Sequence, residues 1–250
     1  MSDSFPIPIP PHLPIRISPC PIVESNFEVR FTSSVSWSSM PGLLLAQIRD
    51  RYPEQKDLPL SQLPEEVRKH DPALHNLPLV QFLGPKFIVQ IGPRTIGLGT
   101  TPNHYPGWTE IRNELEWLLE KTKAAGFIKE TERIGVRYID FFPGDVLPKL
   151  LLSVHVADKP LSDVECAVTT SFRRGRLAIR LQVFNGAIVK FGADSKQGTV
   201  LDVDAWYGPL DADLFVNGKQ RFDEAHRTIK ELFFGLLRPE FLATMNPEYT

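Results

Sequence analysis

The regular alternation of apolar and charged residues from Asn26 to Thr32, NFEVRFT, is the feature that most limits how this chain can fold. A period of two predicts a β-strand with one face in a core and the other in water. The three apolar residues would face inward, and Glu28 and Arg30 would face outward. Strands of this kind belong in antiparallel sheets that keep one face solvated.

Further strand patterns follow along the chain. They lie at residues 79–83, 86–91, 95–99, 132–142, 164–173, 176–184, 187–191 and 198–207. The dipeptides Gly84-Pro85 and Gly92-Pro93 are typical of turns and separate the first three. Arg174-Gly175 and Asn185-Gly186 predict tight hairpins in the second half. The pattern therefore predicts a small meander followed by a larger antiparallel sheet.

Helical spacing of apolar residues predicts helices over 42–52, 108–125 and 221–237, with a short helix near 65–69 in an otherwise irregular segment. Gly126 ends the second of these helices. The sequence thus predicts an α+β fold, in which the 108–125 and 221–237 helices pack on the apolar face of the sheet. Residues 22–250 would form one domain, or two joined lobes that meet near residue 128.

Seven prolines crowd residues 1–21. Proline fixes φ and lacks a backbone donor, so this segment is predicted to be extended. Alternating apolar residues between the prolines favour a strap that docks along the domain. Pro11, Pro14 and Arg16 also match the ligand pattern of SH3 domains, which is the alternative interpretation.

The 250-residue composition excludes several classes of protein. The net charge is −2 and basic residues are spread along the chain, which argues against a nucleic-acid partner. Cys20 and Cys166 match neither a disulfide framework nor a zinc-ligand spacing, so reduced thiols are predicted. There is no pattern of a signal peptide and no apolar run that could cross a bilayer. We therefore expect a soluble cytoplasmic protein with no membrane partner.

Because successive side chains of a β-strand point to opposite faces, charged residues two positions apart lie on the same face of the predicted sheet. Candidate ligand-binding residues are Glu28, Arg30, Arg137 and Arg180, and candidate metal ligands are Asp202 and Asp204. Guanidinium groups suit phosphate oxygens, and an acidic pair could hold Mg²⁺. The competing interpretation is a solvated face crossed by ion pairs between strands. A second acidic pair, Asp211-x-Asp213, has the same two interpretations.

Asn26-x-Glu28-x-Arg30 distantly resembles the Glu-x-Glu-x-Lys signature of triphosphate-tunnel enzymes. That resemblance implies a phosphate-binding role for the strand. The first Glu of the signature, normally a metal ligand in that family, is Asn26 here.

Several longer pieces resemble a sporadically distributed prokaryotic protein family of about this length that has no established activity. They are PIVESNFEVRF at 21–31, YPGW at 105–108, RIGVRYIDFF at 133–142, LDVDAWY at 201–207 and FDEAHRTIKELFFGLLRPEFLATM at 222–245. Usual members carry a small residue such as Ala where Ser25 stands, and often Asn where Asp140 stands. The resemblance implies an α+β fold over nearly the whole chain, and it implies no catalytic residue or cofactor.

The leading functional hypothesis is a non-enzymatic binding or regulatory protein that recognises another protein through a sheet edge, the charged face or the proline-rich strap. The chain has no catalytic signature, and the patchy distribution of the group it resembles suggests a defence or toxin–antitoxin setting. The alternative is a metal-dependent enzyme that handles phosphates or triphosphates. In it the three arginines would bind phosphate, and Glu28, Asp202 and Asp204 would bind Mg²⁺.

Overall fold

The computed structural model describes residues 5, 7, 9–102, 104–160, 165–192, 194–211 and 213–249. The strands are β1 (Ile22–Ser33), β2 (Glu54–Asp57), β3 (Val80–Leu83), β4 (Phe87–Gly92), β5 (Thr95–Thr100), β6 (Ile128–Pro143), β7 (His155–Val156), β8 (Lys159–Pro160), β9 (Cys166–Arg174), β10 (Leu177–Phe191) and β11 (Asp194–Tyr207). The α-helices are α1 (Met40–Ile48), α2 (Glu65–His70), α3 (Trp108–Ala125), α4 (Leu214–Leu236) and α5 (Pro239–Ala243). Three short 3-10 helices lie at Trp37–Ser39, Pro59–Gln62 and Leu147–Lys149.

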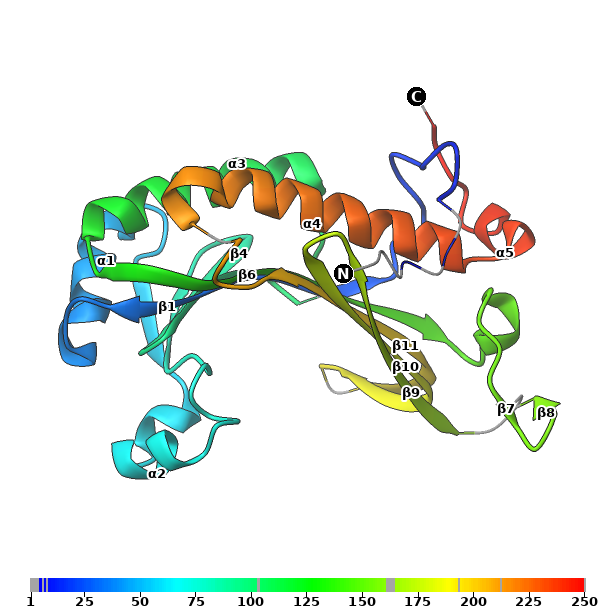
Figure 1. Ribbon diagram of the computed structural model, residues 1–250, viewed down its shortest axis with the longest axis horizontal. Helices are drawn as coiled ribbons and strands as arrows, with labels where there is room; N and C mark the ends of the chain where they lie inside the picture. Colours follow the sequence, from blue (N-terminus) through cyan, green and yellow to red (C-terminus); the bar gives the residue numbers. More distant parts are fainter. Residues whose placement is uncertain are drawn as a thin grey trace. The chain divides into compact units, whose positions relative to one another are not determined.

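The main sheet has nine strands in the order β2-β3-β4-β5-β1-β6-β11-β10-β9, and β7 pairs with β8 separately. The predicted α+β class with a large antiparallel sheet and two long helices is confirmed (Figure 1). The chain forms two compact units: unit 1 comprises residues 1–23, 137–205 and 225–250, and unit 2 comprises residues 24–136 and 206–224. Long elements such as β6 and α4 contribute to both units.

In unit 2 the apolar face of β1 forms the core, as its alternation predicts. Phe27, Val29 and Phe31 are each at most 3% exposed. The Phe27 ring lies 5.8 Å from that of Trp108 in α3 and 6.4 Å from that of Phe222 in α4. Figure 1 shows α1 and α3 on one side of these strands and α2 on the other. The charged face of β1 is therefore the face that α3 does not cover.

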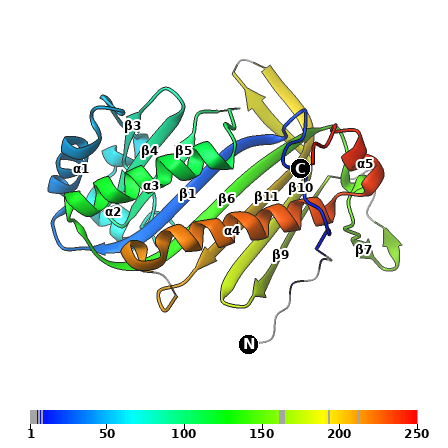
Figure 2. The ribbon, with the colours of Figure 1, turned by 90° about the horizontal axis from the view of Figure 1, so that it is seen from above.

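In unit 1 the second half of α4 packs on β6. The Phe142 ring stacks on Phe233 of α4 at 6.3 Å, and Tyr138 shares a hydrogen bond of 2.9 Å with His226 of the same helix. Burial, with the positive Lys230 second, lowers the pKa of His226 to about 3, so its ring is neutral. Seen from above, α4 crosses the strands at an angle (Figure 2).

The described part of the proline-rich segment contacts the end of the chain within unit 1. Arg16 pairs with Glu248 in an antiparallel bridge, and the Ser18 amide donates to the Met245 carbonyl at 2.7 Å. Pro14, which the SH3 pattern needs to be accessible, is buried. Residues 1–4, Pro6 and Pro8 lie outside the described residues.

The structure corrects the prediction of a hairpin at Asn185-Gly186. The predicted strands 176–184 and 187–191 are one strand, β10, which runs straight through the pair. Gly186 has a φ of 80°, the left-handed conformation that a glycine supplies to a β-bulge as readily as to a turn. The other predicted hairpin, at Arg174-Gly175, is confirmed: Arg174 pairs with Leu177 across a two-residue turn.

Candidate functional site

The charged residues of β1 form one cluster, in unit 2. The Arg30 Nε donates to Glu28 Oε1 at 2.7 Å, and the Arg133 guanidinium of β6 donates to the same oxygen. The side chains of Glu28 and Arg133 are only 16% and 12% exposed. A half-buried carboxylate between two guanidinium groups is strongly held, because each charge offsets the desolvation of the others.

The guanidinium of Arg133 lies over Gly135, two positions further along β6. A Cβ at Gly135 would stand 2.9 Å from the guanidinium carbon of Arg133, so a larger residue there would displace this guanidinium from its present position. The same guanidinium lies 5.1 Å from the ring centroid of Trp206. Such a contact between a cation and an aromatic ring adds to the ion pair. The alternation of side chains along β6 predicts from the sequence that Arg133 lies on this face. Its contact with Glu28 depends on the alignment of β6 with β1, which only the structure shows.

In unit 1 the structure brings Arg137 and Asp202 together. The Nε of Arg137 donates to Oδ1 of Asp202 at 2.8 Å, and its second guanidinium nitrogen donates to Oδ2 at 2.5 Å. The Asp202 side chain is 6% exposed, whereas that of Arg137 is 44% exposed. Both carboxylate oxygens that a metal would use therefore accept hydrogen bonds from Arg137.

The six candidate residues divide between the two units. Glu28 and Arg30 lie in unit 2; Arg137, Arg180, Asp202 and Asp204 lie in unit 1. Arg180 is exposed on β10, and Asp204 is half-buried on β11. Among the described residues, no three or more His, Cys, Asp or Glu side chains are grouped so that they could hold a metal ion.

We expect millimolar Mg²⁺ to leave the melting temperature unchanged, because both Asp202 oxygens already accept hydrogen bonds from Arg137 and the described residues offer no group of three potential ligands. Thermal unfolding with and without MgCl₂ measures this, since a ligand that binds only the folded state raises the melting temperature. A rise that the Asp204→Asn variant removes would instead support the phosphate-handling alternative.

Asp140 is a buried carboxyl group in unit 1 that the sequence did not single out as a site. It is 3% exposed. Burial, with the negative Asp202 carboxylate second, raises the pKa of Asp140 to about 8. At neutral pH this side chain is therefore mostly protonated and neutral.

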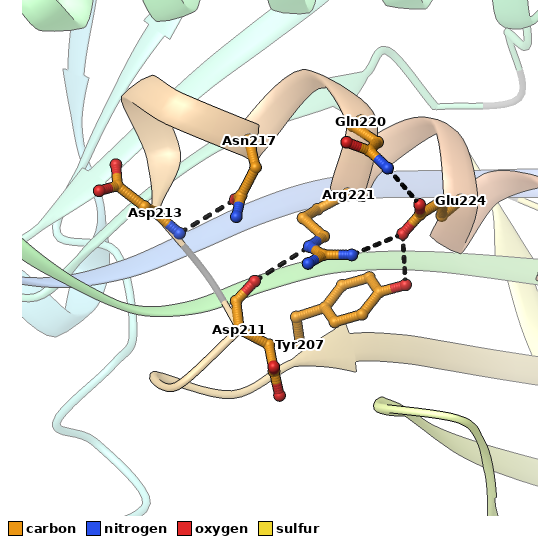
Figure 3. Close-up of polar contacts among 7 residues, drawn as sticks. All are labelled: Tyr207, Asp211, Asp213, Asn217, Gln220, Arg221 and Glu224. Atoms are coloured by element: carbon orange, nitrogen blue, oxygen red, sulfur yellow. Dashed lines mark hydrogen bonds and ion pairs between the residues drawn. The ribbon is translucent and has the colours of Figure 1, made fainter.

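The turn between β11 and α4 holds a polar network, all of it in unit 2 (Figure 3). Glu224 accepts hydrogen bonds from the Tyr207 hydroxyl at 2.6 Å and from Arg221 at 2.9 Å. The Arg221 guanidinium lies 4.4 Å from the Tyr207 ring centroid, and its Nε donates to the Asp211 carbonyl at 3.0 Å. Burial and the neighbouring Glu224 carboxylate raise the pKa of Tyr207 above its usual range, so the phenol stays protonated.

Asp213, in the second acidic pair, caps α4. Its Oδ1 accepts from the backbone amides of Phe215 and Val216 at 3.1 and 3.3 Å. A carboxylate at this position satisfies amides that the first helical turn leaves unpaired. The structure thus supplies a local reason for an aspartate at 213 that needs no metal.

β9 is a terminal strand of the main sheet, and it lies in unit 1. Within the part of the chain that the structure describes, which omits 161–164, it pairs only with β10. Its residues CAVTTSFRR are mostly exposed, and only Phe172 is buried. β-branched residues dominate its middle, and no proline or charge precedes Arg173. Natural edge strands usually carry a proline or a charged residue in the middle of the strand, and these residues prevent pairing with other chains.

The hairpin geometry fixes which backbone groups of β9 point outward. In a two-residue hairpin the residues that flank the turn, here Arg174 and Leu177, form a hydrogen-bonded pair. Hydrogen-bonded and non-hydrogen-bonded pairs then alternate along the ladder. Ala167, Thr169, Ser171 and Arg173 consequently direct their backbone N–H and C=O groups away from β10.

None of the helices in the described residues has the length and apolar character needed to span a membrane. No family model matches the chain, and no curated protein matches it.

Proposed function

We propose that this protein is a non-enzymatic recognition module that binds another protein by adding a strand of that partner to β9. The observation that supports it is the nine-residue outer edge of β9, with four residues whose backbone groups point outward. In strand addition, main-chain hydrogen bonds supply affinity and alternating side chains supply specificity. The sheet beside β9 is long enough to hold such a strand, because β10 pairs with it over all nine residues.

The cellular location and the biological context that we propose for this protein rest on its sequence. The two cysteines are free thiols in the structure, which fits our proposal of a cytoplasmic protein. The resemblance to a sporadically distributed prokaryotic family adds a defence or toxin–antitoxin context to the proposal. The phosphate-handling enzyme stays a prediction, for which the Mg²⁺ experiment is the test.

The Ser171→Pro variant tests the strand-addition proposal. Proline at 171 removes an outward N–H and leaves the ladder to β10 intact, because the Ser171 amide points away from β10. We expect affinity capture from the native host to recover a recurrent protein partner with the wild-type chain. With Ser171→Pro, recovery should fall by about tenfold or more, since one lost hydrogen bond and a steric block act together.

Ser171→Ala is the matched control, since it keeps the backbone amide and removes only the exposed hydroxyl. It should capture the partner as well as the wild type does. Equal recovery with the proline variant, provided its melting temperature is close to that of the wild type, would contradict the proposal.

A further inference from the structure

The two ends of β9 carry opposite charges, and the residues between them are uncharged. Glu165 directly precedes the strand and Arg173 is its last residue but one, and both lie four positions from Thr169. A strand that pairs antiparallel with a second copy of itself brings the start of one strand beside the end of the other. Opposite charges at equal distances from the centre therefore make such a pairing self-complementary.

The outward backbone groups of β9 fit the same pairing. They belong to odd-numbered residues, and Thr169 is one of them. When Thr169 of one copy stands opposite Thr169 of another, Ala167 stands opposite Ser171, and Arg173 stands opposite Glu165. Each residue with outward groups then faces another such residue, so the two strands exchange N–H and C=O hydrogen bonds at every one of these pairs.

The side chains on each face also match in this register. On the face that carries the buried Phe172, Val168 stands opposite Thr170 of the second copy. On the other face the two exposed Thr169 side chains meet. Pairs of β-branched residues and pairs of threonines across neighbouring strands stabilise a sheet. The middle of β9 is therefore suited to pair with itself.

The charged ends favour this register over its neighbour. Glu165 is exposed and accepts a hydrogen bond of 3.5 Å from Gln197. Arg173 is exposed and already has an interaction within its own chain. Because a guanidinium group has five N–H donors, the Glu165 carboxylate of the second copy adds to that interaction and need not replace it. A pairing centred on Thr170 would instead bring Arg173 opposite Ala167 and lose both ion pairs.

We propose that two copies of this chain pair through β9, antiparallel and centred on Thr169, and that this pairing covers the edge until a partner strand displaces it. The inference rests on the proposed strand addition and names the regulation of that site: the dimer closes the edge, and the monomer binds the partner. The nine-stranded sheet of one copy would continue into that of the other across a two-fold axis. The dimer thus protects an edge whose own sequence does not.

Disulfide cross-linking measures the register directly. A hydrogen-bonded antiparallel pair has its Cα atoms about 5.5 Å apart, which suits a disulfide. Thr169→Cys should therefore give a covalent dimer on mild oxidation, visible on a non-reducing gel. Thr170→Cys is the matched control, because its two Cα atoms would lie about 7–8 Å apart, beyond the reach of a disulfide. Both variants carry Cys166→Ser, so that the native thiol of β9 does not contribute.

Charge reversal tests the end pairs in solution. Light scattering should show the wild type passing from 28.3 kDa to twice that mass as its concentration rises. Glu165→Arg and Arg173→Glu should each weaken the dimer by about tenfold, because each brings like charges together. Mixing these two variants should restore the dimer, since every end pair then has opposite charges. Arg176→Glu changes the net charge as Arg173→Glu does, but in the turn, and should leave the dimer unchanged.

The outcomes separate this inference from the proposed function. A chain that stays monomeric at high concentration, while Ser171→Pro abolishes capture of the partner, would overturn the inference alone. A dimer that survives Ser171→Pro, or that Thr170→Cys cross-links better than Thr169→Cys, would also overturn it. A captured partner should convert the dimer into a one-to-one complex, and binding that leaves the dimer intact would contradict the inference. A dimer centred on Thr169, with partner capture that Ser171→Pro does not change, would keep the pairing and overturn the proposed function.

Discussion

The Asp140→Asn variant is expected to be more stable than the wild type at pH 8 and little changed near pH 4. The folded protein holds the pKa of Asp140 at about 8, whereas an unfolded chain has its ordinary value near 3.8. The folded state therefore binds the proton more tightly, so the contribution of Asp140 to stability is most favourable at low pH and is lost as pH rises toward 8. Asparagine has nearly the same shape and no charge to bury.

The expected gain at pH 8 is about 3 kcal/mol, or roughly 10 °C in melting temperature, after allowance for relaxation around a buried charge. Melting curves from pH 4 to pH 8 measure it. The control is Asp194→Asn, because that aspartate is exposed at the start of β11 and should behave as the wild type. Parallel pH profiles for wild type and Asp140→Asn would show that Asp140 is not neutral when folded.

The Gly198→Ala variant is expected to lose about 3 kcal/mol of stability, because the added methyl group meets atoms that cannot move away. A Cβ at this position in unit 1 would lie 2.1 Å from the Phe142 carbonyl oxygen and 2.8 Å from the Phe141 ring. The strand must shift by the greater part of an ångström to accept it. Urea denaturation followed by fluorescence measures the change in the free energy of unfolding.

Gly42→Ala is the control for that substitution. Gly42 lies in α1, and a Cβ there would have no atom within 4 Å. Alanine should stabilise the helix by about 0.5–1 kcal/mol. A Gly198→Ala variant as stable as the wild type would mean that β11 and β6 are not packed as closely as the structure shows.

Local patterns predicted the helix over 108–125 with both of its ends, since α3 occupies those residues and Gly126 follows with a φ of 70°. The helix predicted over 221–237 begins at Leu214 instead. The Asn217-Gly218 dipeptide is typical of turns but lies inside this helix, because Asp213 caps it and Leu214 is buried. β2 was missed because all four of its residues are exposed, which leaves no alternation to detect.

For the candidate site, alternation predicted the faces but not the contacts. It placed Glu28 and Arg30 together because they share a strand. The partners Arg133 for Glu28 and Arg137 for Asp202 depend on how distant strands are aligned, which no single strand encodes. The raised pKa of Asp140 likewise depends on its burial. The sequence does not predict that burial, because the apolar neighbours Ile139 and Phe141 do not show which face of the strand is covered.

The docking of the proline-rich segment also sets an order of events during synthesis. The segment is held by residues that lie far along the chain: the Asn246 side chain donates to the Ser18 carbonyl across 228 positions. At ribosomal rates that distance corresponds to roughly 10 to 45 s, during which Pro14, which is buried in the folded chain, has nothing to dock against. We therefore expect nascent chains stalled before Met245 to be cleaved by protease near Pro14, and the released, folded chain to resist. The growing protein would thus display a proline-rich motif that the finished one conceals.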